Sequence, residues 1–180
     1  MHALAEHAPG IGVELSVVTR AAARTPGPPW PFLLHVTTAA SDAKTVFGDG
    51  HAGDPDLLMH YVVCRAAAVV IRGPDPRSLI GEIGRAHVLG YLRAELRWAL
   101  EHAPEAYGVL NACRALAYLE NSSVVSKIEG AQYAIDRGGP VDLINESLSM
   151  QQVTSADRPP SREAREFIDG VVQQLAARER

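Results

Sequence analysis

The sequence predicts an α+β protein, in which an incomplete α/β layer is followed by an all-α helical bundle domain. Three observations predict this class. Apolar residues alternate along short segments near the start, which is typical of strands. The stretch "RGPDPRSL" then interrupts the chain with Gly and Pro, and beyond it apolar residues recur at helical spacing almost to the end. We therefore expect two domains, residues 1–73 and residues 74–180.

The first part is a short mixed segment. "VELSVVT" alternates as a strand does, with Leu15 and Val17 on one face and Glu14 on the other. "PFLLHVTT" is a second candidate strand, and "TPGPPWP" between them is a loop, because Pro suits neither a helix interior nor a ladder. "SDAKTVFGDGHAGD" is expected to be another loop. Asp54 is a candidate N-cap before Pro55, so "DPDLLMHYVVCRA" predicts a short helix, and "AVVIRG" a last short strand.

The second part is helical. Asp75 and Pro76 provide a cap and a first turn. Apolar residues recur from Leu79 to Leu100, and glycines at positions 81, 84 and 90 within this stretch predict a helix that is kinked or in two pieces. Further helices are expected over residues 105–120, from Ser126 to "DRGGP", over 141–150 and over 161–177, separated by "ENSS" and "TSADRPPS".

Composition excludes several classes of protein. The net charge of −4 argues against a nucleic-acid binder that relies on phosphate contacts. Cys64 and Cys113 are the two cysteines of the sequence, too few for a disulfide framework or a cysteine-rich zinc site, and the histidines lack metal-ligand spacing. No signal peptide or membrane span is expected, since "YVVCRAAAVVI" is short and contains Arg65. We expect a monomeric cytoplasmic protein with no metal site of its own, no nucleic-acid partner and no membrane association.

Three charged residues could carry chemistry. Glu14 is either an exposed strand carboxylate or a carboxylate that faces a polar site, where it could bind metal or act as a general base. Lys127 is either a solvated lysine or a cation held for an anion, because a positive charge at a helix start opposes the helix dipole and suits phosphate. Arg114, in the middle of a helix, is typical of a partly buried arginine with a carboxylate or phosphate partner. From composition alone, Trp98 and Tyr107 are more often packing residues than ligand contacts.

The segment "YGVLNACRALAYLENSSVVSKIEGAQYAI", residues 107–135, resembles the helical C-terminal domain of bacterial aminoglycoside nucleotidyltransferases, the streptomycin/spectinomycin adenylyltransferase family. That family carries Y-A-V-L-N-x-C-R, a Gly turn, and then S-K-x-x-G/A-x-x-W-A. Tyr133 stands where tryptophan is usual, and "NSS" replaces the Gly turn. "GVELSVVT" and "DPDLLMHYVVCRAAAVVIRGP" are similar to the later catalytic strand and the closing helix and strand of the family's nucleotidyltransferase domain. The residues that fit the pattern are Tyr107, Val109, Leu110, Asn111, Cys113, Arg114, Ser126, Lys127, Gly130 and Ala134.

The resemblance implies a function. Family members use ATP and Mg²⁺ to transfer AMP to an aminoglycoside hydroxyl and release pyrophosphate, in a cleft between the nucleotidyltransferase domain and the helical domain. Glu14 matches the proposed catalytic base, and Lys127 matches the lysine that meets the ATP phosphates, with Ser126 and Arg114 beside it. The resemblance places the remaining candidates, Trp98, Glu101 and Tyr107, on the side of the aminoglycoside.

One departure from the family pattern separates two hypotheses. In the family a G-S turn, followed by a D-x-D pair that holds the magnesium ions, precedes the strand that corresponds to Glu14, and this sequence has no counterpart there. "DPD" at 54–56 matches the start of a later helix instead. We therefore expect residues 1–73 to be a partial nucleotidyltransferase domain and the chain to be truncated, inactive alone and doubtful in binding ATP and Mg²⁺. The alternative is a non-catalytic helical module that binds an aminoglycoside or a nucleotide.

Overall fold

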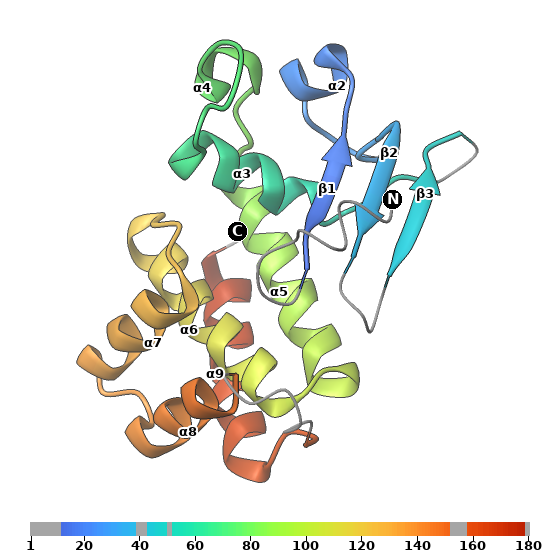
Figure 1. Ribbon diagram of the computed structural model, residues 1–180. Helices are drawn as coiled ribbons and strands as arrows, with labels where there is room; N and C mark the ends of the chain where they lie inside the picture. Colours follow the sequence, from blue (N-terminus) through green and yellow to red (C-terminus); the bar gives the residue numbers. More distant parts are fainter. Residues whose placement is uncertain (1–11, 39–42, 50–51, 152–157, 179–180) are drawn as a thin grey trace. The chain divides into compact units, whose positions relative to one another are not determined.

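A computed structural model describes residues 12–38, 43–49, 52–151 and 158–178. The chain forms two compact units, residues 1–83 and residues 84–180. The described residues contain a three-stranded sheet in the first unit and eight helices, of which five make up the second unit (Figure 1). The predicted α+β class, with a small sheet followed by a helical bundle, is confirmed.

The sheet is antiparallel throughout, with strand order β1-β2-β3. Glu14 pairs with Thr37, which in turn pairs with Lys44, so these three side chains form a row on one face. Ser16 and His35 belong to the next row of the same face. Polar side chains of all three strands thus gather on one side of the sheet. The strands are β1 (Glu14–Val17), β2 (Leu34–Thr37) and β3 (Lys44–Phe47).

The structure corrects two predictions about strands. β3 lies within the segment that was expected to be a loop. It was not predicted because a strand of four residues is too short to show a clear alternation of apolar and polar residues. "AVVIRG" is not a strand; Val69 and Ile71 are 88% and 96% exposed, and no described strand pairs with this segment. A short apolar run becomes a strand only where a neighbouring strand satisfies its backbone groups, and periodicity does not reveal that neighbour.

The helices of the first unit are α2 (Arg20–Arg24), α3 (Leu57–Ala67) and α4 (Pro76–Leu79). The sequence did not predict α2, in which Thr19 accepts a hydrogen bond from the amide of Ala22 at 3.0 Å. The helix α3 begins two residues later than expected, with Asp56 at the N-cap position. Asp54 instead accepts a bond from the amide of Asp56 at 3.0 Å, which forms the turn before the helix. Asp75 caps α4 as predicted, through the amide of Arg77.

In the second unit α6 contacts the other four helices, and its residues supply much of the core. The predicted break is confirmed, since residues 80–84 separate α4 from α5. The predicted bounds of the remaining helices agree with the structure to within two residues. These helices are α5 (Arg85–His102), α6 (Glu105–Asn121), α7 (Lys127–Asp136), α8 (Val141–Gln151) and α9 (Arg162–Arg178).

Two contacts position the helices of this unit. A Cβ atom added at Gly130 would lie 2.9–3.2 Å from three atoms of Arg114, so glycine is what allows α7 to approach α6 this closely. The Glu105 carboxylate, at the start of α6, is buried; it accepts hydrogen bonds from Arg158 and from the amide of Ser161 at 2.6 Å. It thereby ties the start of α9 to α6. None of the described helices combines the length and apolar character needed to cross a membrane.

Candidate functional site

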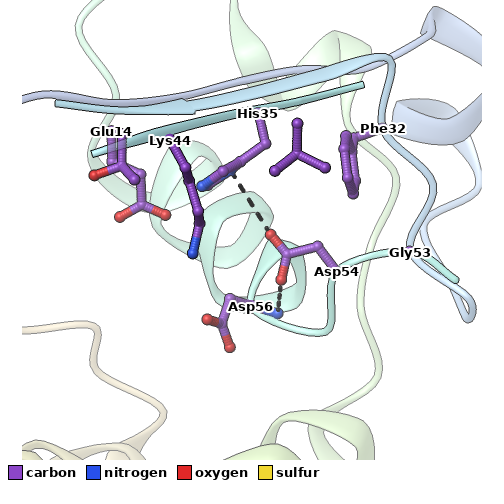
Figure 2. A pocket seen from close by; sticks show the side chains of 9 residues that line it. Glu14, Phe32, His35, Lys44, Gly53, Asp54 and Asp56 are labelled. Atoms are coloured by element: carbon purple, nitrogen blue, oxygen red, sulfur yellow. Dashed lines mark hydrogen bonds and ion pairs between the residues drawn. The ribbon is translucent and has the colours of Figure 1, made fainter. Parts of the chain in front are cut away.

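The polar face of the sheet forms one wall of a cavity of about 470 Å³ in the first unit. Figure 2 shows Glu14, His35 and Lys44 projecting from the strands toward Asp54 and Asp56, which belong to the turn that leads into α3. The face is largely polar because β1 places Glu14 and Ser16 on it, β2 places His35 and Thr37 there, and β3 contributes Lys44 beside the apolar Val46. The cavity is lined by Glu14, Phe32, His35, Thr37, Lys44, Val46, Gly53, Asp54 and Asp56.

Glu14 lies at the edge of this cavity, with its side chain half-exposed. Its Oε1 atom is 3.5 Å from Nε2 of His60, on α3, so a protonated His60 would form an ion pair with it. Of the two readings of Glu14 that the sequence left open, its place in a polar cavity favours the functional one. The assignment of Glu14 as a catalytic base remains a prediction.

His35 and Asp54 were not predicted to belong to a site. The His35 ring is buried, with Nδ1 at 3.0 Å from Oγ of Ser16 and 3.9 Å from Oδ2 of Asp54. The signal that could have found His35 is the alternation in "LHVT", which places it on the same face as Thr37. Asp54 was interpreted only as a helix cap, and its place beside the sheet depends on the tertiary fold.

Three carboxylates, those of Glu14, Asp54 and Asp56, line the cavity together. Although they line the same cavity, these carboxylates do not form a magnesium site. Among the described residues, no group of three His, Cys, Asp or Glu side chains is arranged so that it could hold a metal ion.

In the second unit, Lys127 is the first residue of α7, one residue after the predicted start at Ser126, and its side chain is half-buried. Its ammonium nitrogen lies 5.4 Å from the centre of the Tyr107 ring, within the range of a cation–π contact. No carboxylate of the described residues forms an ion pair with it. Burial lowers the pKa of Lys127, and the neighbouring Arg114 guanidinium lowers it further. The ammonium is therefore held in an environment that disfavours its charge.

The structure gives Ser126 and Arg114 local partners. Ser126 forms a capping box with Glu129: its hydroxyl accepts from the Glu129 amide at 3.2 Å, and its own amide donates to the Glu129 carboxylate at 2.8 Å. Arg114 donates to the carbonyl of Val125 at 3.0 Å and to the amide oxygen of Asn111 at 3.2 Å. Of the carboxylate or phosphate partner expected for Arg114, the described residues show no carboxylate; the guanidinium ties α6 to the segment before α7. Phosphate binding by either residue remains a prediction.

The three residues that were expected to contact the aminoglycoside differ in their surroundings. The rings of Tyr107 and Trp98 meet edge to face at 6.1 Å, and Trp98 also stacks on His102. Trp98 is 49% exposed, so its ring is available to a ligand as well. Glu101 is exposed on the same helix.

Glu95 is a residue of this cluster that sequence reasoning missed. Its carboxylate accepts a hydrogen bond from the Tyr107 hydroxyl at 2.6 Å. Its spacing could have revealed it, because Glu95, Trp98 and His102 are three and four residues apart and lie on one face of α5. The structure thus brings Lys127, Tyr107 and Trp98 together with Glu95. Glu14 lies in the other unit, and the expectation that it shares a cleft with Lys127 remains a prediction.

Comparison with known proteins identifies related folds. The family described as aminoglycoside adenylyltransferase, C-terminal domain, matches residues 79–175, more than half of the chain. No curated protein matches the sequence. A crystal structure of the spectinomycin adenyltransferase AAD(9) from Enterococcus faecialis, with ATP and spectinomycin, is similar in fold, with a TM-score of 0.64. The similarity covers 91% of this chain and 68% of that one at 12% sequence identity, so it concerns the fold alone.

Proposed function

Because the chain belongs to the aminoglycoside adenylyltransferase family through its C-terminal domain, residues 79–175, we propose that its helical unit binds ATP and an aminoglycoside. In the proposed arrangement Lys127 contacts the ATP phosphates, and Trp98, Glu101 and Tyr107 contact the drug. The reaction that this binding serves is transfer of AMP from ATP to a hydroxyl of a streptomycin- or spectinomycin-type antibiotic. The crystallised AAD(9) contains ATP and spectinomycin, which are the ligand classes proposed here.

The observation that carries the proposal is the environment of Lys127. Burial of an ammonium is unfavourable unless a partner compensates it, and an opposite charge is the strongest partner. Lys127 is half-buried, is close enough to Arg114 for that cation to lower its pKa, and is paired with no carboxylate of the described residues. A polyphosphate would supply the missing negative charge. A fully solvated lysine would show neither the burial of Lys127 nor its contact with the Tyr107 ring.

The drug side of the proposal rests on exposure and charge. Trp98 offers an exposed aromatic ring against which the apolar face of a sugar can pack. The carboxylates of Glu95 and Glu101 belong to the same helix, and acidic groups attract the ammonium groups of an aminoglycoside. We propose Glu14, in the polar cavity of the first unit, as the base that removes the proton of the attacking hydroxyl.

The test is direct binding of ATP and of the drugs to the purified chain by calorimetry. Lys127→Ala is expected to weaken ATP binding about ten- to a hundredfold, because it removes a charge-assisted phosphate contact, and to leave streptomycin and spectinomycin binding largely intact. The matched control is Arg137→Ala, which removes one cation from the other end of α7. An unchanged ATP affinity in Lys127→Ala, or an equal loss in Arg137→Ala, would contradict the proposal.

Turnover separates the two functions that the sequence left open. We propose that a polypeptide of these 180 residues transfers negligible AMP to either drug, because its described carboxylates do not come together to hold the metal ions that such a transfer requires. Drug binding without turnover would favour a non-catalytic binding module. Pyrophosphate release that depends on drug and magnesium, and that Glu14→Gln abolishes, would instead establish the chain as an enzyme.

A further inference from the structure

Tyr107 is the point at which three helices of the second unit contribute to one cluster. Its hydroxyl donates to Glu95 on α5, its ring lies under the ammonium of Lys127 on α7, and the Tyr107 backbone belongs to α6. The ring also meets Trp98 edge to face. One aromatic side chain therefore contacts both the residue proposed for the nucleotide and a residue proposed for the drug.

The bond between Tyr107 and Glu95 restricts the ring. At 2.6 Å it has the short distance typical of a hydroxyl that donates to an ionised carboxylate, which is stronger than a bond between neutral groups. A tyrosine side chain has two main torsions, so a bond at its tip and a ring contact with Trp98 leave it one orientation. The carboxylate also polarises the phenol, which makes the ring face more negative.

The ring in turn restricts Lys127. A lysine side chain is a flexible chain of four carbons, and an ion pair would normally determine where its ammonium lies. Lys127 has no such pair among the described residues, and the face of the Tyr107 ring is the attractive group that the structure places next to its ammonium.

We propose that Glu95 is a positioning residue: through the Tyr107 hydroxyl it holds the ring that presents the Lys127 ammonium to the phosphates of ATP. This inference rests on the proposed role of Lys127, and it adds a residue that touches neither the nucleotide nor the ammonium. The charge of Glu95 acts on Lys127 through the ring and without an ion pair. The ammonium can therefore pair with phosphate. A carboxylate bonded directly to Lys127 would compete with the phosphate for it.

The same unit contains a matched control. The Tyr133 hydroxyl donates to Glu120 at 2.7 Å, and the Arg137 guanidinium lies 4.8 Å from the centre of the Tyr133 ring. This second group has the same three components, but Arg137 also forms an ion pair with Glu120. Tyr133→Phe therefore removes the same kind of hydrogen bond as Tyr107→Phe, at a place without a proposed function.

The position of the ammonium can be measured without any nucleotide. The sequence contains two lysines, Lys44 and Lys127, so reductive ¹³C-methylation labels these two side chains and the amino terminus, and Lys44→Arg assigns the signals. The ring current of Tyr107 is expected to shift the Lys127 methyl signal upfield. Tyr107→Phe and Glu95→Leu should each move it toward the position of an exposed lysine, and Tyr133→Phe should leave it unchanged. A Lys127 signal that is the same in wild type, Tyr107→Phe and Glu95→Leu would overturn the proposal.

The second readout is ATP affinity. Tyr107→Phe and Glu95→Leu are each expected to weaken ATP binding about three- to tenfold, and the double variant no further, because the two side chains act as one unit. Glu95→Gln, which keeps an acceptor and loses the charge, should retain part of the affinity. Independent, additive losses, or an equal loss in Tyr133→Phe, would mean that the pair has only a structural role.

The two proposals fail in different ways. If Lys127→Ala leaves the ATP affinity unchanged, the proposed function of Lys127 is wrong whatever the methyl signals show. If Lys127→Ala weakens ATP binding but Tyr107→Phe and Glu95→Leu do not, Lys127 is a phosphate ligand and Glu95 does not position it.

Discussion

The two ends of α7 hold a cation in opposite ways. At the C-terminal end, Arg137 lies over the Tyr133 ring and pairs with Glu120, which also accepts the Tyr133 hydroxyl. At the N-terminal end, Lys127 lies over the Tyr107 ring, but the carboxylate that accepts the Tyr107 hydroxyl, Glu95, forms no ion pair with it. In one group the cation is paired with the carboxylate, and in the other the cation and the carboxylate form no ion pair.

This difference separates a stabilising contact from a binding site. A closed ion pair satisfies both partners, so it contributes to stability and has little to offer a ligand. A half-buried cation without a counterion costs stability, which is typical of a residue kept for function. The similar residue types at the two ends show that composition does not decide the role; the decisive feature is whether the carboxylate reaches the cation.

The largest effect on stability is expected for a buried ion pair. Arg158 donates to Glu105, which is 1% exposed, and to Glu146, whose side chain is 51% exposed. Glu105→Gln should lower the free energy of unfolding by about 2–3 kcal/mol, because it removes the buried charge that Arg158 and the Ser161 amide satisfy. Glu146→Gln is the control and should cost much less. Chemical denaturation measures both, and equal losses would show that burial is not what matters.

The stability that Glu105 contributes should also depend on pH. Burial alone would raise the pKa of Glu105, but hydrogen bonds from Ser161 and Arg158 outweigh it, so the pKa lies below the ordinary value of 4.5. The stability that these bonds contribute is therefore present above pH 4.5 and is lost as pH falls through the lowered pKa. Glu105→Gln should lack this acid-dependent loss.

The next effect concerns the placement of α7 itself. Gly130→Ala is expected to destabilise the protein by about 1–3 kcal/mol, because the added methyl group would meet the backbone and Cγ of Arg114 at 2.9–3.2 Å. Gly170→Ala, on α9, has open space around the new Cβ and should stabilise by about 0.5–1 kcal/mol. Thermal unfolding of both variants checks the pair; stabilisation by Gly130→Ala would show that the close approach of α6 and α7 is relaxed in solution.

A smaller effect is expected at the exposed end of α7. Arg137→Ala should lower the free energy of unfolding by less than about 1 kcal/mol, since both members of its ion pair with Glu120 are well exposed. Its loss should also shrink as salt is raised, because exposed charges are screened. A loss as large as that of Glu105→Gln, measured in the same denaturation experiment, would show that the exposed ion pair contributes as much to stability as the buried one.

The smallest effect is a change of ATP affinity with pH. Because burial and Arg114 lower the pKa of Lys127 below 10.5, the ammonium loses its proton, and its attraction for phosphate, before an exposed lysine would. ATP affinity should therefore decline as pH rises through the alkaline range below 10.5. Lys127→Arg is expected to remove this decline, because a guanidinium stays charged. Identical pH profiles for lysine and arginine would contradict an uncompensated cation at this position.

Much of the helical unit is determined by the sequence itself, because its signals are local. Ser126 and Glu129 are three residues apart, and a capping box needs nothing more than that spacing, so the start of α7 could be predicted. Asp75 and Pro76 predicted the start of α4 in the same way. The pattern over residues 107–135 was also sufficient to indicate the family.

The tertiary structure alone decided which side chains meet. β3 was missed and "AVVIRG" was wrongly predicted as a strand, because a strand depends on hydrogen bonds to a distant segment, which alternation does not identify. Glu95, Tyr107 and Lys127 lie on three different helices, so no spacing in the sequence joins them. Their contact depends on how α5 and α7 pack against α6, and that packing is set by the buried faces of all three helices and by the absence of a side chain at Gly130.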